Sequence, residues 1–194
     1  MKYVYIEAKD NHQPEHNFLR IYAEHLGLKD IEFVPVDGKD NLTKQKNQMR
    51  QHLLEEDVVA VLFDADEPAN LGGFSKRLPI VLEQLQQMQV IAPVFLWPNN
   101  HDDGDFEVML EHIVRRDLHT TFFDCFADYE ACVGTKYETP NRKGKFHTFV
   151  TAQRGLSKTK RDKVGHGNWL FNDPNLWNLD SPYLEPLRTF LLNL

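Results

Sequence analysis

The chain has 194 residues, of which 41% are hydrophobic and 26% charged, a composition typical of a folded domain and not of a disordered chain. No apolar run approaches the roughly 18 residues that a membrane span needs, and the start, MKYVYIEAKD, acquires charge too early for a secretory signal. Together with only two cysteines, these features predict a reduced cytoplasmic protein without a membrane partner.

Four aliphatic segments alternate with amphipathic ones in the first two thirds of the chain. Consecutive apolar positions are typical of parallel strands covered on both faces, and they occur at residues 3–6, 31–36, 58–63 and 90–97. Helical patterns lie between and after them, at residues 14–26, 41–54, 78–88 and 106–114. Strand alternating with helix predicts an α/β fold, with a Rossmann-like parallel sheet of about four strands flanked by helices.

The last third of the chain has a different, helical and loop-rich pattern. We expect helices at 121–133 and 145–153, a polar loop at 155–167, and a final helix capped by Ser181 with Pro182 at its first position. Residues 1–116 are therefore interpreted as an α/β core and residues 117–194 as a helical extension packed on it. The two parts are expected to form one domain.

Charge is distributed unevenly along the chain. The net charge of −7 argues against a surface that coats nucleic acid without selectivity. Residues 136–163, however, contain nine Lys and Arg against two acidic residues. This basic segment is either a contact surface for a polyanion or a solvated loop.

Carboxylates follow three of the four predicted strands. Glu7 follows the first strand, and Asp64 and Asp66 follow the third; after the fourth come Asp103, Asp105 and Glu107. The carboxyl ends of parallel strands meet at one edge of a sheet, where ligands bind in open α/β folds. Residues spaced i, i+2 on a strand share a side, so Asp64 and Asp66 are expected to reach one ion or a close pair.

Oxygen ligands of this kind suit Mg²⁺ or Mn²⁺, and a pair of such ions can serve phosphodiester chemistry. Each acid also has a simpler interpretation. The strand-end acids could merely be solvated, and Asp105 and Glu107 could favour the dipole at the start of a helix. The nine histidines leave a zinc site as a further alternative.

Two of these acidic motifs resemble a known family. "YIEAKDN" after the first strand and "FDADE" after the third resemble the Toprim domain of topoisomerases, primases, recombination proteins and OLD nucleases. Ala8 stands where the family usually has glycine. The segments "VDGKDNL", "FLWPNNHDDGDFE" and "LWNLDSPYLEPLRTFL" are similar to a bacterial family of short Toprim-like proteins related to OLD nucleases, a resemblance that covers nearly the whole chain.

The resemblance implies metal-dependent phosphodiester chemistry on DNA or RNA, with Mg²⁺ or Mn²⁺ as cofactor. On this hypothesis Glu7 is a metal ligand or general acid/base, and Asp64 and Asp66 are metal ligands. A second ion would use Asp103, Asp105 and Glu107.

Basic residues complete this hypothesis. Lys39, at the start of a predicted helix, would hold a phosphate together with the helix N-terminus, unless it is simply a surface lysine. The basic segment, through Arg142, Lys143 and Lys145, would contact the nucleic-acid backbone. OLD nucleases carry an ATPase on the same chain, so a separate ATPase is an expected partner here. The alternative is a non-catalytic, regulatory module that binds metal or a partner.

Overall fold

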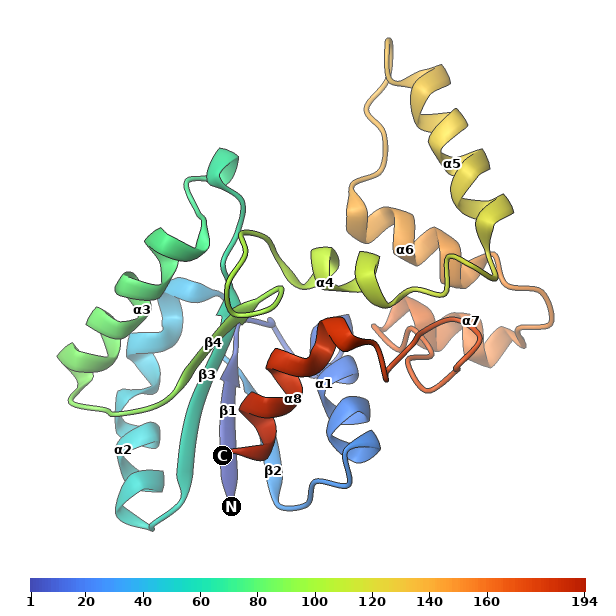
Figure 1. The fold of residues 1–194 in the computed structure, drawn as a ribbon. Coiled ribbons are helices and arrows are strands. Elements are labelled where there is room, and N and C mark those ends of the chain that lie inside the picture. Colours follow the sequence, from blue (N-terminus) through green and yellow to red (C-terminus); the bar gives the residue numbers. More distant parts are fainter.

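The computed structural model describes residues 1–194, except for the side chain of Asn70, and has a four-stranded parallel sheet at its centre (Figure 1). The strands are β1 (Lys2–Ile6), β2 (Ile31–Pro35), β3 (Val58–Asp64) and β4 (Val94–Trp97), in the order β2-β1-β3-β4. The predicted α/β fold with a Rossmann-like parallel sheet flanked by helices is confirmed.

The register of the sheet places the first and third strand ends side by side. Ile6 of β1 pairs with Leu62 of β3, and Asp64 at the end of β3 pairs with Trp97 of β4. Glu7 therefore leaves the sheet next to Asp64. The aliphatic residues that precede them are fully buried, which explains why these inner strands carry no alternating polar positions.

Helices cover both faces of the sheet and separate its core into two clusters. One cluster lies under α1 (Pro14–His25) and α8 (Glu185–Leu192) and includes Phe18 and Leu187. The other lies under α2 (Lys46–Leu54) and α3 (Phe74–Met88) and includes Met49. In Figure 1 these helix pairs flank the strands on opposite sides, and both chain termini lie at the same end of the sheet.

The remaining helices lie beyond the carboxyl ends of the strands. They are α4 (Phe106–Ile113), α5 (Thr120–Val133), α6 (Arg142–Thr151) and α7 (Lys158–Gly165). Phe146 and Phe149 of α6 belong to the same core cluster as Phe18, so α6 is anchored to the α1 face of the sheet. In Figure 1, α5 extends away from the sheet.

The predicted polar loop at 155–167 is wrong, because it contains α7. Ser157 caps this helix by accepting a hydrogen bond from the backbone N–H of Lys160 at 3.2 Å. Val164 is its only buried residue among the described side chains. A helix with one buried residue has no apolar stripe along one face, so its sequence lacks the hydrophobic periodicity by which helices are predicted.

Other boundaries also differ from expectation. The helix predicted at 41–54 begins as a 3₁₀-helix, η1 (Lys39–Gln45), before α2, and η3 (Pro182–Leu184) precedes α8. A further 3₁₀ turn, η2, spans Pro68–Asn70. β4 begins only at Val94 because Pro93 has no N–H to donate to the sheet. None of the described helices is both long and apolar enough to cross a membrane.

Candidate functional site

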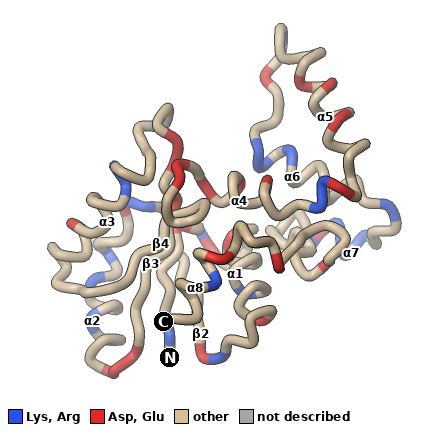
Figure 2. The backbone as a smooth tube through the Cα atoms, viewed as in Figure 1, with Lys and Arg blue, Asp and Glu red and all other residues tan. Residues whose placement is uncertain are grey.

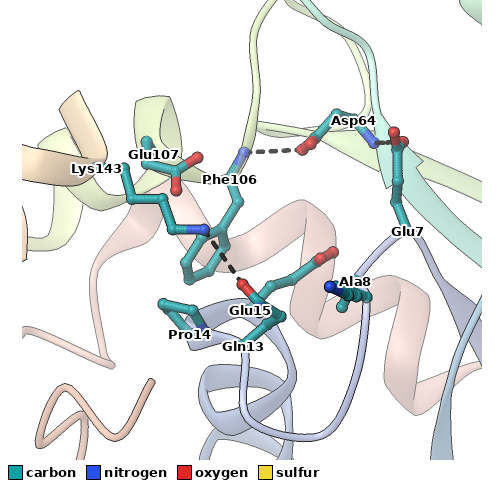
Figure 3. A pocket seen from close by; sticks show the side chains of 10 residues that line it. Glu7, Ala8, Gln13, Pro14, Glu15, Asp64, Phe106, Glu107 and Lys143 are labelled. Atoms are coloured by element: carbon teal, nitrogen blue, oxygen red, sulfur yellow. Dashed lines mark hydrogen bonds between the residues drawn. The ribbon is translucent and has the colours of Figure 1, made fainter. Parts of the chain in front are cut away.

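A cavity of about 210 Å³ opens at the carboxyl ends of β1 and β3 (Figure 3). Four acids from different parts of the fold line it: Glu7, Glu15, Asp64 and Glu107. We call this the carboxylate cavity. Its other lining residues are Ala8, Lys9, Gln13, Pro14, Phe106 and Lys143.

Backbone hydrogen bonds hold the two strand-end acids in place. The N–H of Asp64 donates to Oε2 of Glu7 at 3.4 Å, and the N–H of Phe106 donates to Oδ1 of Asp64 at 2.9 Å. Asp64 thus joins the end of β3 to the first residue of α4. The predicted proximity of Glu7 and Asp64 is present in the structure.

Glu15 belongs to this site although the sequence analysis did not single it out. It lies in the first turn of α1, is 8% exposed, and accepts a hydrogen bond at Oε1 from the indole N–H of Trp97 at 2.8 Å. The sequence did contain a signal for Glu15. It precedes Phe18 by three residues and Leu19 by four, so it lies on the same buried face of the helix as these two. A carboxylate on an apolar helix face is rare without a function or a partner.

The two acids near the start of α4 have different roles in the structure. Asp105 is the N-cap of this helix, and its Oδ1 accepts from the N–H of Val108 at 2.8 Å. This is the simpler interpretation offered for Asp105. Glu107 points into the carboxylate cavity near Lys143 (Figure 3), so only Glu107 of this pair lines the cavity.

Burial raises the pKa of all four cavity acids, and nearby carboxylates, some inside the cavity and some outside it, add to the rise. Desolvation is the largest cause for each. It lifts the pKa of Glu15 from 4.5 to about 8, with Glu7 and Glu107 adding to the rise. The pKa of Asp64 is raised well above its usual range by desolvation and then by Glu15 and Glu7. Such a group of acids is electrostatically unfavourable unless protons or cations neutralise it.

Asp66 and Asp103 do not line the cavity. β3 ends at Asp64, and Asp66 has φ of 60°, so the strand alternation that would place Asp64 and Asp66 on one side does not hold. The carboxylate of Asp66 instead forms ion pairs with Arg77 and with Lys39, the latter at 3.1 Å. Asp103 accepts a hydrogen bond from the N–H of Phe74 at 2.6 Å, at the start of α3.

Of the predicted basic contacts, Lys143 is the one that reaches the cavity. Its Nζ donates to Oε1 of Gln13 at 3.2 Å beside the acids (Figure 3). Arg142 and Lys145 form ion pairs at 2.6 Å, each with its own acidic partner: Arg142 with Glu67 and Lys145 with Glu111. Figure 2 shows basic residues at the start of α6 and acidic residues around the ends of β3 and β4.

Two further cavities continue from the carboxylate cavity along α6 and α7. The first, of about 310 Å³, shares Gln13, Pro14 and Lys143 with it, and the second, of about 430 Å³, shares His12 with the first. We call these two cavities the basic trough. Its charged and imidazole side chains are His12, Lys143, His147, Asp162, Lys163 and His166.

The donor set of the carboxylate cavity fits a hard divalent cation. Mg²⁺ takes oxygen ligands, usually one or two carboxylates together with water and phosphate oxygens. Glu7, Asp64 and Glu107 supply such oxygens. Their carboxylate oxygens are more widely spaced than the ligand atoms of another described group, His52, Glu55 and Asp57, which lie within 4.8 Å of one another. Side-chain rotation in the cavity would therefore accompany binding of an ion by more than one acid.

Comparison with protein-family models, curated proteins and solved structures finds no match to this chain. The resemblance to the Toprim domain remains a prediction from the motifs.

Proposed function

We propose that this protein is a Mg²⁺- or Mn²⁺-dependent nuclease that hydrolyses phosphodiester bonds in DNA or RNA. The observation that carries this proposal is the convergence of four acids, one buried and three half-buried and all with raised pKa, on one cavity at the carboxyl edge of the sheet. Desolvated carboxylates that repel one another are typical of sites in which a bound cation neutralises their charge.

Glu7, Asp64 and Glu107 are the residues that would hold the ion. When bound, a divalent ion supplies positive charge to a phosphodiester and to the negative charge that develops as the bond breaks. Asp64 is held by the N–H of Phe106, which fixes the direction of its carboxylate. Lys143 and Lys9, the basic residues among the cavity lining, can attract the phosphate and orient it.

The basic trough supports a nucleic-acid strand over a small phosphate ester as substrate. A monoester would need only the carboxylate cavity. A strand would extend beyond the cleaved bond, and His12, Lys143 and His147 lie where its neighbouring phosphates could bind. Attraction to successive phosphates is the main source of affinity for nucleic acid.

Asp66 gives one observation in favour of the alternative, a non-catalytic module. Both Lys39 and Arg77 already neutralise its carboxylate. Its role as a metal ligand, and that of Lys39 as a phosphate contact, would require these ion pairs to open. A module that binds metal or a partner without cleavage would not need either role, and a separate ATPase partner is compatible with both functions.

Calorimetric titration of Mn²⁺ and Mg²⁺ into wild type, Asp64→Asn and Asp40→Asn tests the first step. Asparagine keeps the oxygen that accepts from Phe106 but removes the charge, so Asp64→Asn should fold normally and bind at least tenfold more weakly. Asp40 is exposed on η1 and serves as the matched control. Equal binding by wild type and Asp64→Asn, or no binding by either, would contradict the proposal.

A second assay separates the nuclease from the module. An end-labelled single-stranded oligonucleotide is incubated with the protein and Mn²⁺, in parallel with p-nitrophenyl phosphate. Cleavage of the oligonucleotide that is lost in Asp64→Asn supports the nuclease. Metal binding without any cleavage favours the module, and hydrolysis of the monoester alone indicates a phosphatase.

A further inference from the structure

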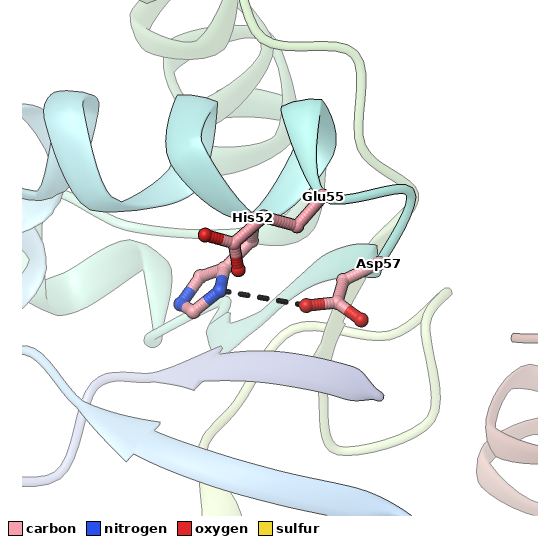
Figure 4. A group of neighbouring side chains, drawn as sticks. All are labelled: His52, Glu55 and Asp57. Carbon is pink, nitrogen blue, oxygen red and sulfur yellow. Dashed lines mark ion pairs between the residues drawn. The ribbon is translucent and has the colours of Figure 1, made fainter.

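A second group of metal-ligating side chains lies at the opposite edge of the sheet. His52 is in the last turn of α2, Glu55 follows that helix, and Asp57 directly precedes β3. One ligand atom from each of the three lies within 4.8 Å of the others (Figure 4). The amino ends of the strands are here, so this group is separate from the carboxylate cavity.

The turn after α2 brings these side chains together. The N–H of Asp57 donates to the carbonyl of His52 at 3.0 Å, and Glu56 adopts a positive φ of 60° that reverses the chain. The imidazole of His52 is stacked on the ring of Tyr3, with ring centroids 3.6 Å apart and planes 17° apart. The ring orientation is thus set by β1, independently of the acids.

His52 has hydrogen-bonding capacity that the described residues do not use. Both of its ring nitrogens are buried, and neither has a hydrogen-bond partner among the described residues. Nδ1 lies 3.8 Å from Oδ2 of Asp57, which is too long for a hydrogen bond. Oδ1 of Asp57 accepts from the amino group of Met1 at 2.7 Å, which leaves Oδ2 facing the imidazole.

The distance between Nδ1 of His52 and Oδ2 of Asp57 is close to the distance between two ligand atoms bound to one ion. Metal–ligand bonds of 2.0–2.2 Å at a tetrahedral angle place ligand atoms about 3.4 Å apart. The 3.8 Å between Nδ1 and Oδ2 needs only a small closure, and the exposed Glu55 can rotate to add its carboxylate. An imidazole with two carboxylates suits Zn²⁺, whereas Mg²⁺ prefers an all-oxygen shell.

We infer that His52, Glu55 and Asp57 form a Zn²⁺ site, with the fourth position open to water. The ion ties the end of α2 to the start of β3, so its binding stabilises the fold. This inference does not rest on the proposed nuclease function. It also concerns a different class of metal from the one proposed for the carboxylate cavity.

The test uses the full chain without an affinity tag, in buffer freed of metal. Co²⁺, which has visible absorption bands in tetrahedral sites, is titrated first and then displaced with Zn²⁺; the melting temperature is measured with and without Zn²⁺. We expect one ion per chain and a rise of several degrees in melting temperature. Excess Mg²⁺ should not displace the Co²⁺.

Variants distinguish this site from other metal-binding groups. His52→Ala and Glu55→Gln should each weaken binding at least tenfold, and Glu55→Gln changes only an exposed side chain, so it should fold normally. His25→Ala is the matched control, because it removes a histidine paired with a single acid, Asp180, at 2.8 Å. Binding that is unchanged in Glu55→Gln, absent from wild type, or lost only in Asp64→Asn would overturn the inference.

Discussion

Replacing Glu15 by glutamine should make the protein more stable above about pH 5. Glutamine has nearly the same shape, and its amide oxygen can still accept from the indole N–H of Trp97. Glutamine does not ionise, so at this position, which is 8% exposed, the fold needs neither to bury a charge nor to bind a proton. A gain in stability on deleting an acid is the signature of a residue retained for function and not for folding.

The sign and size of the effect follow from the pKa of Glu15. In the unfolded chain the group ionises above its ordinary pKa of 4.5, whereas the folded chain keeps the proton up to about pH 8. The unfolded state then binds fewer protons, so the stability of the wild type falls as pH rises from 4.5 to about 8. At 1.36 kcal/mol per pKa unit, the upper limit of this loss is roughly 5 kcal/mol.

Part of the loss is shared with the neighbouring acids, because Glu7 and Asp64 titrate together with Glu15. We therefore expect Glu15→Gln to be more stable than wild type by at least about 2 kcal/mol at pH 8 and nearly equal to it at pH 4.5. Urea unfolding at pH 4.5, 6.5 and 8 in the presence of EDTA measures this difference. Glu24→Gln, an exposed change on the same helix, is the control.

The reasoning is refuted if Glu15→Gln is no more stable than wild type at pH 8, or if the difference does not grow with pH. The same experiment with Mn²⁺ adds a second check. Since the ion would offset the charge of the acids, it should stabilise wild type more at pH 8 than at pH 5.

Three further predictions concern binding and folding. Lys143→Ala should weaken binding of single-stranded DNA several-fold, and about one counterion fewer should be released on binding, so that the affinity falls less steeply with salt concentration. Lys76→Ala, on α3, should change neither quantity. Fluorescence anisotropy of a labelled oligonucleotide at several salt concentrations measures both variants. Arg77→Met should lower the free energy of unfolding by about 2 kcal/mol in urea titrations, because it removes the buried cation that pairs with the carboxylate of Asp66. Gly167→Ala should cost at least about 2 kcal/mol because a Cβ there would collide with backbone, whereas Gly165→Ala meets nothing nearby.

Each of these predictions has an outcome that contradicts it. Equal DNA affinity of the Lys143 and Lys76 variants would remove the basic trough from the proposed substrate path. If Arg77→Met leaves the free energy of unfolding unchanged, the ion pair with Lys39 alone is enough to neutralise Asp66. Equal unfolding midpoints for the two glycine variants would show that the contact of Gly167 with His12 is not tight in solution.

Much of the fold was accessible from the sequence because it depends on local patterns. Short aliphatic runs rich in β-branched residues, such as 58–63, favour strands buried on both faces, and the helices between them favour parallel connections. The meeting of Glu7 and Asp64 followed from this, since parallel strands end at one edge. The helix α7 was missed because a single buried residue, Val164, leaves no periodic signal.

The composition of the site was decided by the tertiary structure. Past the end of β3 the strand alternation no longer applies, and the positive φ of Asp66 turns its carboxylate toward Arg77, a residue that no local pattern connects with it. Glu15 joins the cavity only because α1 packs against Trp97. Among the basic residues of 136–163, the docking of α6 on the core brings Lys143 to the acids. Side-chain direction beyond a strand end and the docking of distant helices depend on long-range packing, whereas strands, helices and their order depend on neighbouring residues.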